Sequence, residues 1–260
     1  MAPATSRNLA PESLEFFART WEVYRRVVAD DLMEHAGLLA ALRRRLEGFL
    51  QERDRAPLTP APLTLVDLAC GDLTTLAPLL RQLPLAGFTG VDGCATVLPL
   101  AQARLAGWAV PCRWLNDDLL HWAESAGERH ALISSLFGLH HLADADKQRF
   151  LTAVADRLEP GGLLLIGDVF REPGESRDHY VQRYVRRIRH GWTTLSSAQQ
   201  DQVVAHLSSS DFPAERDHFE AMAARAGWQG EWLWTGSHQA EALLGLRRSP
   251  VAPPQQQQQP

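Results

Sequence analysis

Between residues 64 and 170, short apolar runs alternate with stretches in which apolar residues recur at helical spacing. A short continuous apolar run suits a strand that is covered on both faces, whereas recurrence at every third or fourth residue suits a helix with one buried face. Strands that alternate with helices form βαβ units, so this pattern predicts a parallel sheet with helices on both faces. The expected strands cover residues 64–69, 87–91, 108–115, 131–137 and 163–169.

The part of the chain before residue 64 has a different pattern of apolar residues and prolines. Residues 13–52 carry apolar residues at helical spacing and are expected to form an N-terminal helical cap or lid. Residues 53–63 are rich in proline, which cannot continue a helix, and are expected to be a linker. Residues 1–12 are polar and are expected to be flexible.

After the alternation, the chain continues with a charged helical stretch at residues 173–208, expected to be an insertion on the substrate side. A further helix and two candidate strands at 231–235 and 241–246 follow it. The α/β domain is therefore expected to extend over residues 64–248. Residues 249–260 are a Gln/Pro-rich tail of low complexity, for which disorder is expected.

The composition excludes several classes of protein. Of the 260 residues, 45% are hydrophobic, and the net charge of −5 is unlike that of a duplex-binding protein. No apolar run is long enough to span a membrane. The three cysteines, Cys70, Cys94 and Cys112, form neither a disulfide framework nor a zinc motif, which favours a soluble cytoplasmic protein with reduced thiols. The ten histidines are scattered without metal-ligand spacing, so no metal site is predicted.

The turn after the first expected strand carries the strongest functional signal. Residues 66–72 read V-D-L-A-C-G-D and join this strand to the next helix. Ligands of doubly wound sheets bind beyond the carboxyl ends of the strands, and small residues such as Ala69 and Gly71 let the backbone approach a ligand closely. Asp92 ends the second strand about 20 residues later, where a carboxylate can accept hydrogen bonds from both ribose hydroxyls. The spacing predicts a nucleoside site.

The glycine pattern indicates which nucleoside binds there. A dinucleotide site uses G-x-G-x-x-G, with backbone amides facing a pyrophosphate. Here the turn has a single glycine, and it places Asp72 where a pyrophosphate would need positive potential. A cofactor that has an ammonium and a sulfonium group but no phosphate fits better, and S-adenosylmethionine is such a cofactor. An NAD-dependent oxidoreductase is disfavoured.

These residues resemble the class I methyltransferase superfamily, whose first motif is acid-x-small-x-Gly-x-Gly. Leu73 stands at the position of the second glycine, which is a departure from the family pattern. The resemblance covers residues 64–170 strongly and 213–248 moderately. Five further stretches match family motifs in order, namely V-D at 91–92, N-D-D at 116–118, L-H-H-L at 139–142, L-E-P-G-G-L-L-L-I at 158–166 and A-G-W at 226–228 before the two last strands.

The resemblance implies an α/β fold, a Rossmann-like sheet of seven mostly parallel strands with helices on both faces, a reversed C-terminal β-hairpin and an N-terminal helical cap. It also implies S-adenosyl-L-methionine as cofactor, with Asp67 and Gly71 at the methionine end and Asp92 at the ribose. Asp117, or its neighbour Asp118, would reach the adenine amine. The cofactor-binding candidates are Asp67, Ala69, Gly71, Asp92, Asp117, Asp118, Ser135 and Leu136, of which the last two would pass close to the sulfonium.

The catalytic candidates are His140, His141, Tyr180 and Tyr184. A histidine has a reference pKa of about 6.5, which suits proton removal at neutral pH, although many family members carry L-H-H-L without using either ring. The sequence does not separate the two histidines. For Cys70 we expect packing rather than chemistry.

The substrate and lid candidates are Trp21, Tyr24, Arg177 and Arg187. At helical spacing Arg177, Tyr180, Tyr184 and Arg187 share one face, which could hold an anionic or aromatic substrate. The alternative is an exposed basic helix whose tyrosines pack on the core. Trp21 and Tyr24 belong either to a lid over the cofactor or to a helical face that covers the sheet.

The predicted reaction is direct displacement, in which an N or O atom of a small-molecule substrate attacks the methyl group of the sulfonium. Two alternatives remain open at this point. The basic helix at residues 177–190 is the only support for an RNA (tRNA) methyltransferase. Leu73 in place of glycine keeps open a non-catalytic protein that binds the cofactor or a metabolite. Neither a membrane partner nor an oligomeric state is predicted.

Overall fold

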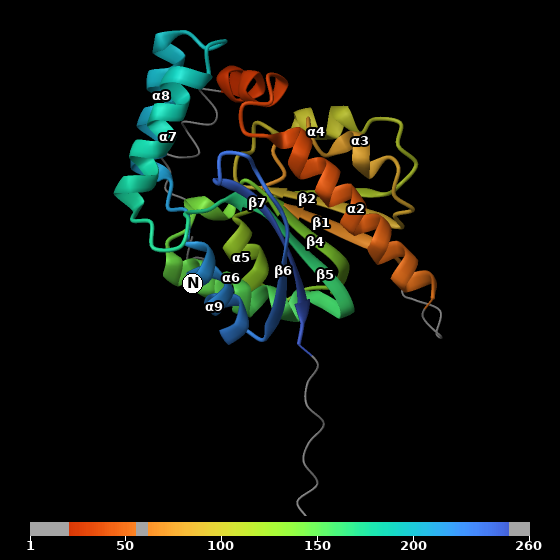
Figure 1. Ribbon diagram of the computed structural model, residues 1–260. Helices are drawn as coiled ribbons and strands as arrows, with labels where there is room; N and C mark the ends of the chain where they lie inside the picture. The colour runs from red at the N-terminus through yellow and green to blue at the C-terminus, as the bar shows by residue number, and fades with distance from the viewer. Residues whose placement is uncertain (1–20, 56–61, 250–260) are drawn as a thin grey trace, which may run out of the picture.

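The computed structural model describes residues 21–55 and 62–249, so the expected flexible N-terminus, most of the linker and most of the tail lie outside the described residues. Its centre is a seven-stranded sheet in the order β3-β2-β1-β4-β5-β7-β6 (Figure 1). The strands are β1 Thr64–Leu68, β2 Gly87–Asp92, β3 Cys112–Asn116, β4 His130–Leu136, β5 Leu158–Val169, β6 Trp228–Thr235 and β7 Glu241–Arg248. Strands β1 to β5 pair in parallel, and β7 runs antiparallel to β5 and β6. This confirms the predicted Rossmann-like sheet with its reversed hairpin.

Helices cover both faces of the sheet (Figure 1). One face carries α2 His35–Asp54, α3 Ala77–Leu80 and α4 Leu98–Arg104, and the other carries α5 Leu119–Glu124, α6 Asp144–Ala153 and α9 Arg216–Arg225. The short 3-10 helices η1 Leu139–His141 and η2 Val154–Arg157 flank α6. A helical pair, α7 Arg177–Gly191 and α8 Ser197–Ser210, follows β5.

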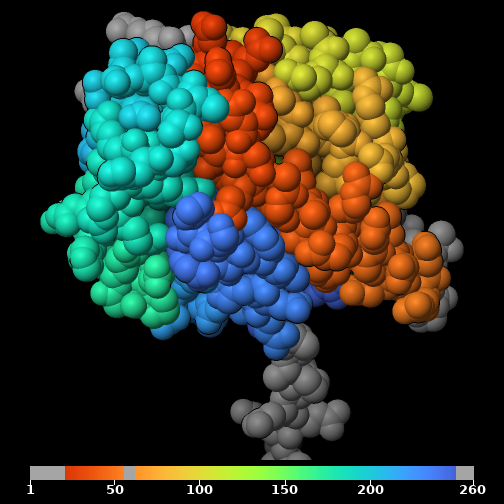
Figure 2. Space-filling model, turned by 45° about the horizontal axis from the view of Figure 1, so that its top comes forward, coloured from red at the N-terminus to blue at the C-terminus, as the bar shows by residue number. Residues whose placement is uncertain are grey.

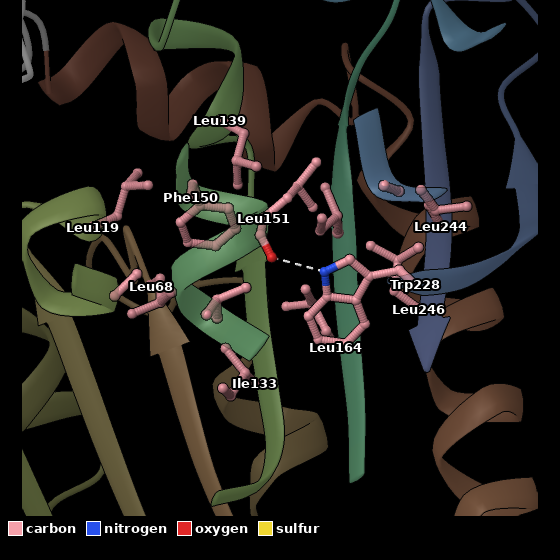
Figure 3. Close-up of a cluster of buried hydrophobic side chains, with 14 of the residues drawn as sticks. Leu68, Leu119, Ile133, Leu139, Phe150, Leu151, Leu164, Trp228, Leu244 and Leu246 are labelled. Atoms are coloured by element: carbon pink, nitrogen blue, oxygen red, sulfur yellow. Dashed lines mark hydrogen bonds between the residues drawn. The ribbon is translucent and has the colours of Figure 1, made fainter. Parts of the chain in front are cut away.

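The alternation of side chains along the strands explains why both faces are covered. Val66 and Leu68 of β1 belong to the hydrophobic cluster under α5, α6 and α9, whereas Leu65 points into the cluster under α2, α3 and α4. Figure 3 shows the first cluster, where the Trp228 indole donates a hydrogen bond of 2.8 Å to the carbonyl oxygen of Leu151. Because helices cover both faces of the sheet, ligands can reach it only at the ends of its strands.

A third hydrophobic cluster joins α7 and α8 to the helical segment at residues 21–29. Val23 and Val27 of this segment pack with Tyr180, Tyr184 and Ile188 of α7. In Figure 2 the red segment lies between the cyan α7–α8 pair and the yellow region of α3 and α4. The described part of the expected N-terminal cap thus divides into two pieces. The segment 21–29 lies beside α7 and α8, and α2 packs on the sheet.

Two element boundaries differ from the sequence-based prediction. The third strand was expected from residue 108 but begins at Cys112, because Gly107 with φ +73° turns the chain and Trp108 packs against Phe88 instead. The fifth strand was expected to begin at residue 163, but β5 begins at Leu158 and includes the Pro-Gly-Gly at residues 160–162. Leu158 already pairs with His130 there, and the register then shifts before Leu163 pairs with Leu132.

None of the helices within residues 21–55 and 62–249 is long and apolar enough to cross a lipid bilayer.

Candidate functional site

The carboxyl ends of β1 to β4 meet at one cleft, here called the strand-end cleft. It holds about 680 Å³ of empty space, its solvent-open part included. Its lining residues are Trp21, Tyr24, Ala69, Gly71, Asp92, Gly93, Cys94, Val97, Asp117, Leu119, Leu136, Phe137, Gly138 and His141. The cleft therefore brings together Ala69, Gly71, Asp92, Asp117 and Leu136 of the predicted cofactor set, together with both aromatic lid candidates.

The turn after β1 has an unusual backbone. Ala69, Gly71 and Leu73 all adopt the left-handed region, with φ of 56°, 55° and 59°. Leu73, at the place of the family glycine, keeps the conformation that glycine favours and buries its side chain among α3 and α4. Cys70 packs in the same cluster, and burial raises the pKa of its thiol well above the usual value, in agreement with the expected packing role.

Close approach of backbones shapes the floor of the cleft. A Cβ atom on Gly138 would lie 2.7 Å from the Cβ of Ala69 and 3.0 Å from the Ser135 hydroxyl. Position 138 therefore accepts only glycine while the turn after β1 stays in place. Gly138 follows β4 as Ala69 follows β1, and the two small residues leave room for a ligand between the strand ends.

Asp92 connects the strand ends. Its Oδ2 accepts a hydrogen bond of 2.8 Å from the amide of Gly71, and its Oδ1 accepts one of 2.8 Å from the amide of Cys94. Burial raises the pKa of this carboxyl, and the two amide hydrogen bonds lower it in part. Each carboxylate oxygen retains acceptor capacity for a further donor. Asp92 thus lies where it can accept both hydroxyls of a ribose.

Asp117 and Asp118 have different roles. Asp117 lines the cleft, and its Oδ1 accepts the Asp118 amide at 2.9 Å and lies 2.6 Å from Nδ1 of His121. Asp118 caps α5 by accepting hydrogen bonds from the amides of Leu120 and His121. Of the two adenine candidates, Asp117 lies in the lining of the cleft and Asp118 at the start of α5.

Two other predicted cofactor residues lie behind the cleft rather than in its lining. Ser135 is fully buried, and its hydroxyl has no hydrogen-bond partner within the described residues. Asp67 is 2% exposed and accepts a hydrogen bond of 2.6 Å from the Ser134 hydroxyl. Burial raises the pKa of Asp67 to about 7, although the bond from Ser134 opposes this shift. Direct contact of these two residues with a cofactor stays a prediction.

Replacing Asp67 by asparagine is expected to remove a pH-dependent part of the stability. The carboxyl has a pKa of about 7 in the folded chain and an ordinary value of 3.8, so the folded state holds the proton more tightly. This stabilisation is complete below about pH 4 and is lost as the pH rises through 7. Urea unfolding at a series of pH values should give a steeper decline between pH 4 and 7 for the wild type than for Asp67→Asn. Parallel declines would contradict the assignment, and Asp54→Asn, at an exposed position of α2, is the matched control.

The structure also corrects the argument from Asp72. Its carboxylate turns away from the cleft and forms an ion pair of 2.9 Å with Arg104, and it accepts hydrogen bonds from Thr74. Its charge is therefore compensated and does not by itself disfavour a phosphate. The single glycine and the carboxylates of Asp92 and Asp117 still favour a cofactor without phosphate.

A second, more apolar cavity adjoins the strand-end cleft. It holds about 730 Å³ of empty space, its solvent-open part included. Tyr24 and Phe137 line both this cavity and the cleft. Phe137 has a left-handed backbone with φ 56°, which is rare for a bulky residue and marks a local strain between the two spaces. The apolar cavity is lined by Val23, Tyr24, Val27, Met33, Phe137, His140, Val169, Tyr180, Tyr184, Trp192, Val203, His206, Leu207 and Asp211.

The two histidines of the L-H-H-L motif lie on different sides of this junction. His140 lines the apolar cavity, and its Nδ1 lies 2.6 Å from Oδ1 of Asp168. Burial lowers the pKa of His140, but the charges of Asp168 and Asp211 outweigh burial and raise it overall. His141 lines the cleft, and burial, reinforced by its histidine neighbours, lowers its pKa well below the usual value.

The predicted tyrosines line the apolar cavity, but they cannot act as bases at neutral pH. Burial raises the pKa of both Tyr180 and Tyr184 well above the usual value, so both phenols stay protonated. The hydroxyl of Tyr184 donates a hydrogen bond of 2.7 Å to the buried carboxylate of Glu241. Both rings form apolar walls of the cavity, and any catalytic role of the two tyrosines other than proton removal stays a prediction.

Arg177 and Arg187 bind protein groups instead of facing a substrate. Arg177 donates to the carbonyl oxygens of Ser208 and Asp211 at the end of α8. Arg187 donates to both oxygens of Glu241 at 2.7 and 2.8 Å. The expected substrate-binding arginines therefore stabilise the walls of the apolar cavity.

Sequence reasoning missed several residues of the two cavities. Gly93, Cys94 and Val97 follow the β2 end, and Gly138 follows the β4 end. The rule that identified Asp92 could have found them, because every residue just beyond a parallel strand is a candidate. His206 and Asp211 of the apolar cavity carry no such signal, since His206 lies within α8 and Asp211 directly follows this helix.

Comparison with known proteins identifies the domain. Residues 65–162 match the model of the methyltransferase domain family. These residues form a methyltransferase domain. The cofactor of this family is S-adenosylmethionine, and the carboxylates around the strand-end cleft fit its cationic groups and its ribose.

Among curated relatives, the methyltransferase domain is similar to the ubiquinone biosynthesis O-methyltransferase of Cereibacter sphaeroides. The identity is 28% over 145 residues, which are 53% of this chain and 56% of that protein. The enzyme of the same name from Methylobacterium sp. is 32% identical over 120 residues, 45% of this chain and 46% of that protein. A trans-aconitate 2-methyltransferase of Rhodopseudomonas palustris is 29% identical over 107 residues, 40% of this chain and 38% of that protein. The chain spans about half the length of the curated relatives it matches.

Solved structures share the fold over most of the chain. The complex of DhpI with S-adenosylhomocysteine (SAH) superposes with a TM-score of 0.63 at 15% identity, over 95% of this chain and 100% of that one. The plantazolicin methyltransferase BpumL, also in complex with SAH, gives a TM-score of 0.62 at 13% identity, over 91% of this chain and 93% of that one. At these identities the likeness concerns the fold.

Proposed function

We propose that this protein transfers the methyl group of S-adenosylmethionine to an O or N atom of a small molecule that binds in the apolar cavity. The observation that carries the proposal is that the strand-end cleft and the apolar cavity meet at Tyr24 and Phe137. Two reactants held in adjoining spaces, away from bulk water, fulfil the main requirement of a direct displacement.

The residues of the cleft hold and orient the cofactor. Asp92 accepts the ribose hydroxyls, and Asp117 receives the adenine amine. Asp67 lies deeper, behind the turn after β1, and adds negative charge near the cationic end. When bound, the cofactor supplies a methyl group that is already activated by the sulfonium. Alignment and desolvation supply the rest, which amounts to about 7–11 kcal/mol in favourable cases.

The lining of the apolar cavity indicates the class of substrate. Aliphatic and aromatic side chains form most of the wall, and His140, His206 and Asp211 supply the polar groups. This arrangement suits a hydrophobic, for example aromatic, molecule with one hydroxyl or amine group. The names of the curated relatives, two of which are O-methyltransferases, support oxygen as the acceptor. His140 lines the apolar cavity and His141 lines the cleft, and these two are the candidates to take a proton from a hydroxyl.

The alternative of an RNA substrate has less support than a small molecule. Several of the basic residues of α7 that suggested it form ion pairs within the protein. Arg183 binds Glu175, Arg187 binds Glu241, and Arg189 binds Asp201. Such ion pairs leave less positive charge for phosphate groups. A small molecule in the apolar cavity remains the better-supported substrate.

Filling the apolar cavity is expected to lower turnover strongly without loss of cofactor binding. Val203 of α8 lines this cavity but not the cleft, so Val203→Phe takes up substrate space. The assay supplies methyl-labelled S-adenosylmethionine and a panel of phenols, catechols and aromatic amines, and measures labelled product and SAH. For an accepted compound, Val203→Phe should lower kcat/KM by at least about tenfold, equivalent to about 1.4 kcal/mol.

Ala205→Phe is the matched control, because Ala205 is exposed on the same helix. It should retain wild-type kcat/KM, and both variants should bind SAH like the wild type. Equal turnover by Val203→Phe and wild type would place the substrate elsewhere. Wild-type binding of S-adenosylmethionine without transfer to any compound of the panel would oppose the proposed substrate class.

A further inference from the structure

A cluster of three histidines and one aspartate lies where the two cavities adjoin. His140 and His141 come from η1, His206 from α8, and Asp211 follows the end of α8. Oδ1 of Asp211 lies 3.8 Å from Nε2 of His140, 3.5 Å from Nδ1 of His141 and 3.4 Å from Nε2 of His206. One carboxylate oxygen is thus surrounded by nitrogen atoms of three imidazole rings.

The carboxylate at the centre of this cluster is buried without a hydrogen bond. Asp211 is 8% exposed, and its Oδ1 accepts no hydrogen bond within the described residues despite the three nearby nitrogens. A buried carboxylate oxygen without a donor is costly unless a cation compensates it. The distances to the rings leave space for a small ion between oxygen and nitrogens.

The spacing of the donor atoms fits direct coordination. Ligand atoms at about 2.0–2.2 Å from a tetrahedral ion lie roughly 3.3–3.5 Å from one another. The distances of 3.4 to 3.8 Å from Asp211 to the three rings are close to this value. His140, His141 and Asp211 each offer one ligand atom, all within 4.8 Å of one another.

The surroundings of His140 provide an independent indication. Its Nδ1 is 2.6 Å from Oδ1 of Asp168, which leaves Nε2 free to face Asp211. Asp168 is 1% exposed, and its Oδ2 accepts hydrogen bonds from the amides of Leu139 and His140. Metal-binding histidines typically donate their second ring nitrogen to such a carboxylate, which orients the ring.

We propose that His140, His141 and Asp211 bind a divalent transition-metal ion of the zinc type, with His206 as the fourth ligand. Imidazole nitrogens with a single carboxylate suit Zn²⁺ or Co²⁺, whereas Mg²⁺ and Ca²⁺ prefer oxygen ligands. His141 lines the strand-end cleft and the other three residues line the apolar cavity, so the ion lies at the junction of the two. There a substrate hydroxyl that takes the place of His206 on the ion would be acidified. This role rests on the proposed function, whereas binding of the ion does not.

The test measures metal binding directly. The full-length protein, purified without a histidine tag and treated with a chelator, is titrated with Co²⁺ and Zn²⁺ while visible absorption and heat are recorded. The wild type should bind one Co²⁺ per chain with the d–d absorption of a tetrahedral site. Asp211→Asn should bind Co²⁺ at least about tenfold more weakly, and Asp168→Asn about 10–100-fold more weakly, because its carboxylate orients His140. His179→Ala and Asp178→Asn, at exposed positions of α7, should bind like the wild type.

Thermal unfolding and titration with SAH accompany each variant, so a misfolded variant is recognised. The metal site is refuted if the wild type binds no stoichiometric Co²⁺ or Zn²⁺, or if Asp211→Asn and Asp168→Asn both bind as tightly as the wild type. Metal binding without SAH binding would support the site and refute the proposed function. SAH binding without metal binding would support the proposed function and refute the metal site.

Discussion

Replacing Asp92 by alanine is expected to weaken the binding of SAH by about 10²–10⁴-fold. The carboxylate lies in the strand-end cleft, and each oxygen retains acceptor capacity for one ribose hydroxyl. A hydrogen bond to a charged group contributes about 1.5–3 kcal/mol, so the loss of two amounts to about 3–6 kcal/mol. The same substitution releases the amides of Gly71 and Cys94, which loosens the turn that contacts the cofactor. Isothermal titration with SAH measures the effect.

Two further variants separate recognition from folding. Asp92→Asn keeps one acceptor oxygen and should fall between wild type and Asp92→Ala, whereas the exposed Asp54→Asn should bind like the wild type. Thermal unfolding of each variant in the absence of ligand shows whether the domain is intact. Wild-type affinity in a folded Asp92→Ala would refute the placement of the ribose, and with it the orientation of the cofactor. Failure of the wild type to bind SAH would refute the cofactor site as a whole.

The architecture and the strand-end residues were predictable because they depend on local patterns. Apolar runs alternating with helical spacing are sufficient for β1 to β5, and parallel strands bring their carboxyl ends to one edge. Ala69, Gly71, Asp92 and Asp117 follow from this rule. The same rule could not choose between Asp117 and Asp118, because a shift of one residue separates the cleft from the helix cap.

The sequence could not predict the roles of residues that depend on contacts with distant parts of the chain. Helical spacing placed Arg187 on one face of α7, but its role follows from Glu241 in β7, 54 positions later. The histidine cluster shows the same limitation. His141 and His206 lie far apart along the chain, so the scattered histidines predicted no metal site, and only the packing of α8 against η1 brings their rings to a centroid distance of 5.2 Å.

Replacing Arg187 by methionine is expected to lower the free energy of unfolding by about 3–5 kcal/mol, the usual cost of removing one partner of a buried ion pair. Glu241 is 0% exposed, and Arg187 donates to both of its carboxylate oxygens. Arg187 also donates to the carbonyl oxygen of Leu32, so it joins α7, β7 and the chain before α2. Methionine keeps the apolar stem and leaves a buried carboxylate with the phenol of Tyr184 as its remaining side-chain donor. For a domain of this size Tm should fall by about 6–20 °C.

Two companion variants identify the cause of the loss. Arg186→Met changes an exposed arginine on the same helix and should stay within about 0.5 kcal/mol of the wild type. The double variant Arg187→Met/Glu241→Gln removes both charges and should recover most of the lost stability, because the cost comes from the unpaired carboxylate rather than from the missing pair. A double variant no more stable than Arg187→Met would show instead that the link from Arg187 to Leu32 carries the stability. In that case the N-terminal segment, and not the charge of Glu241, would be what holds α7 over the apolar cavity.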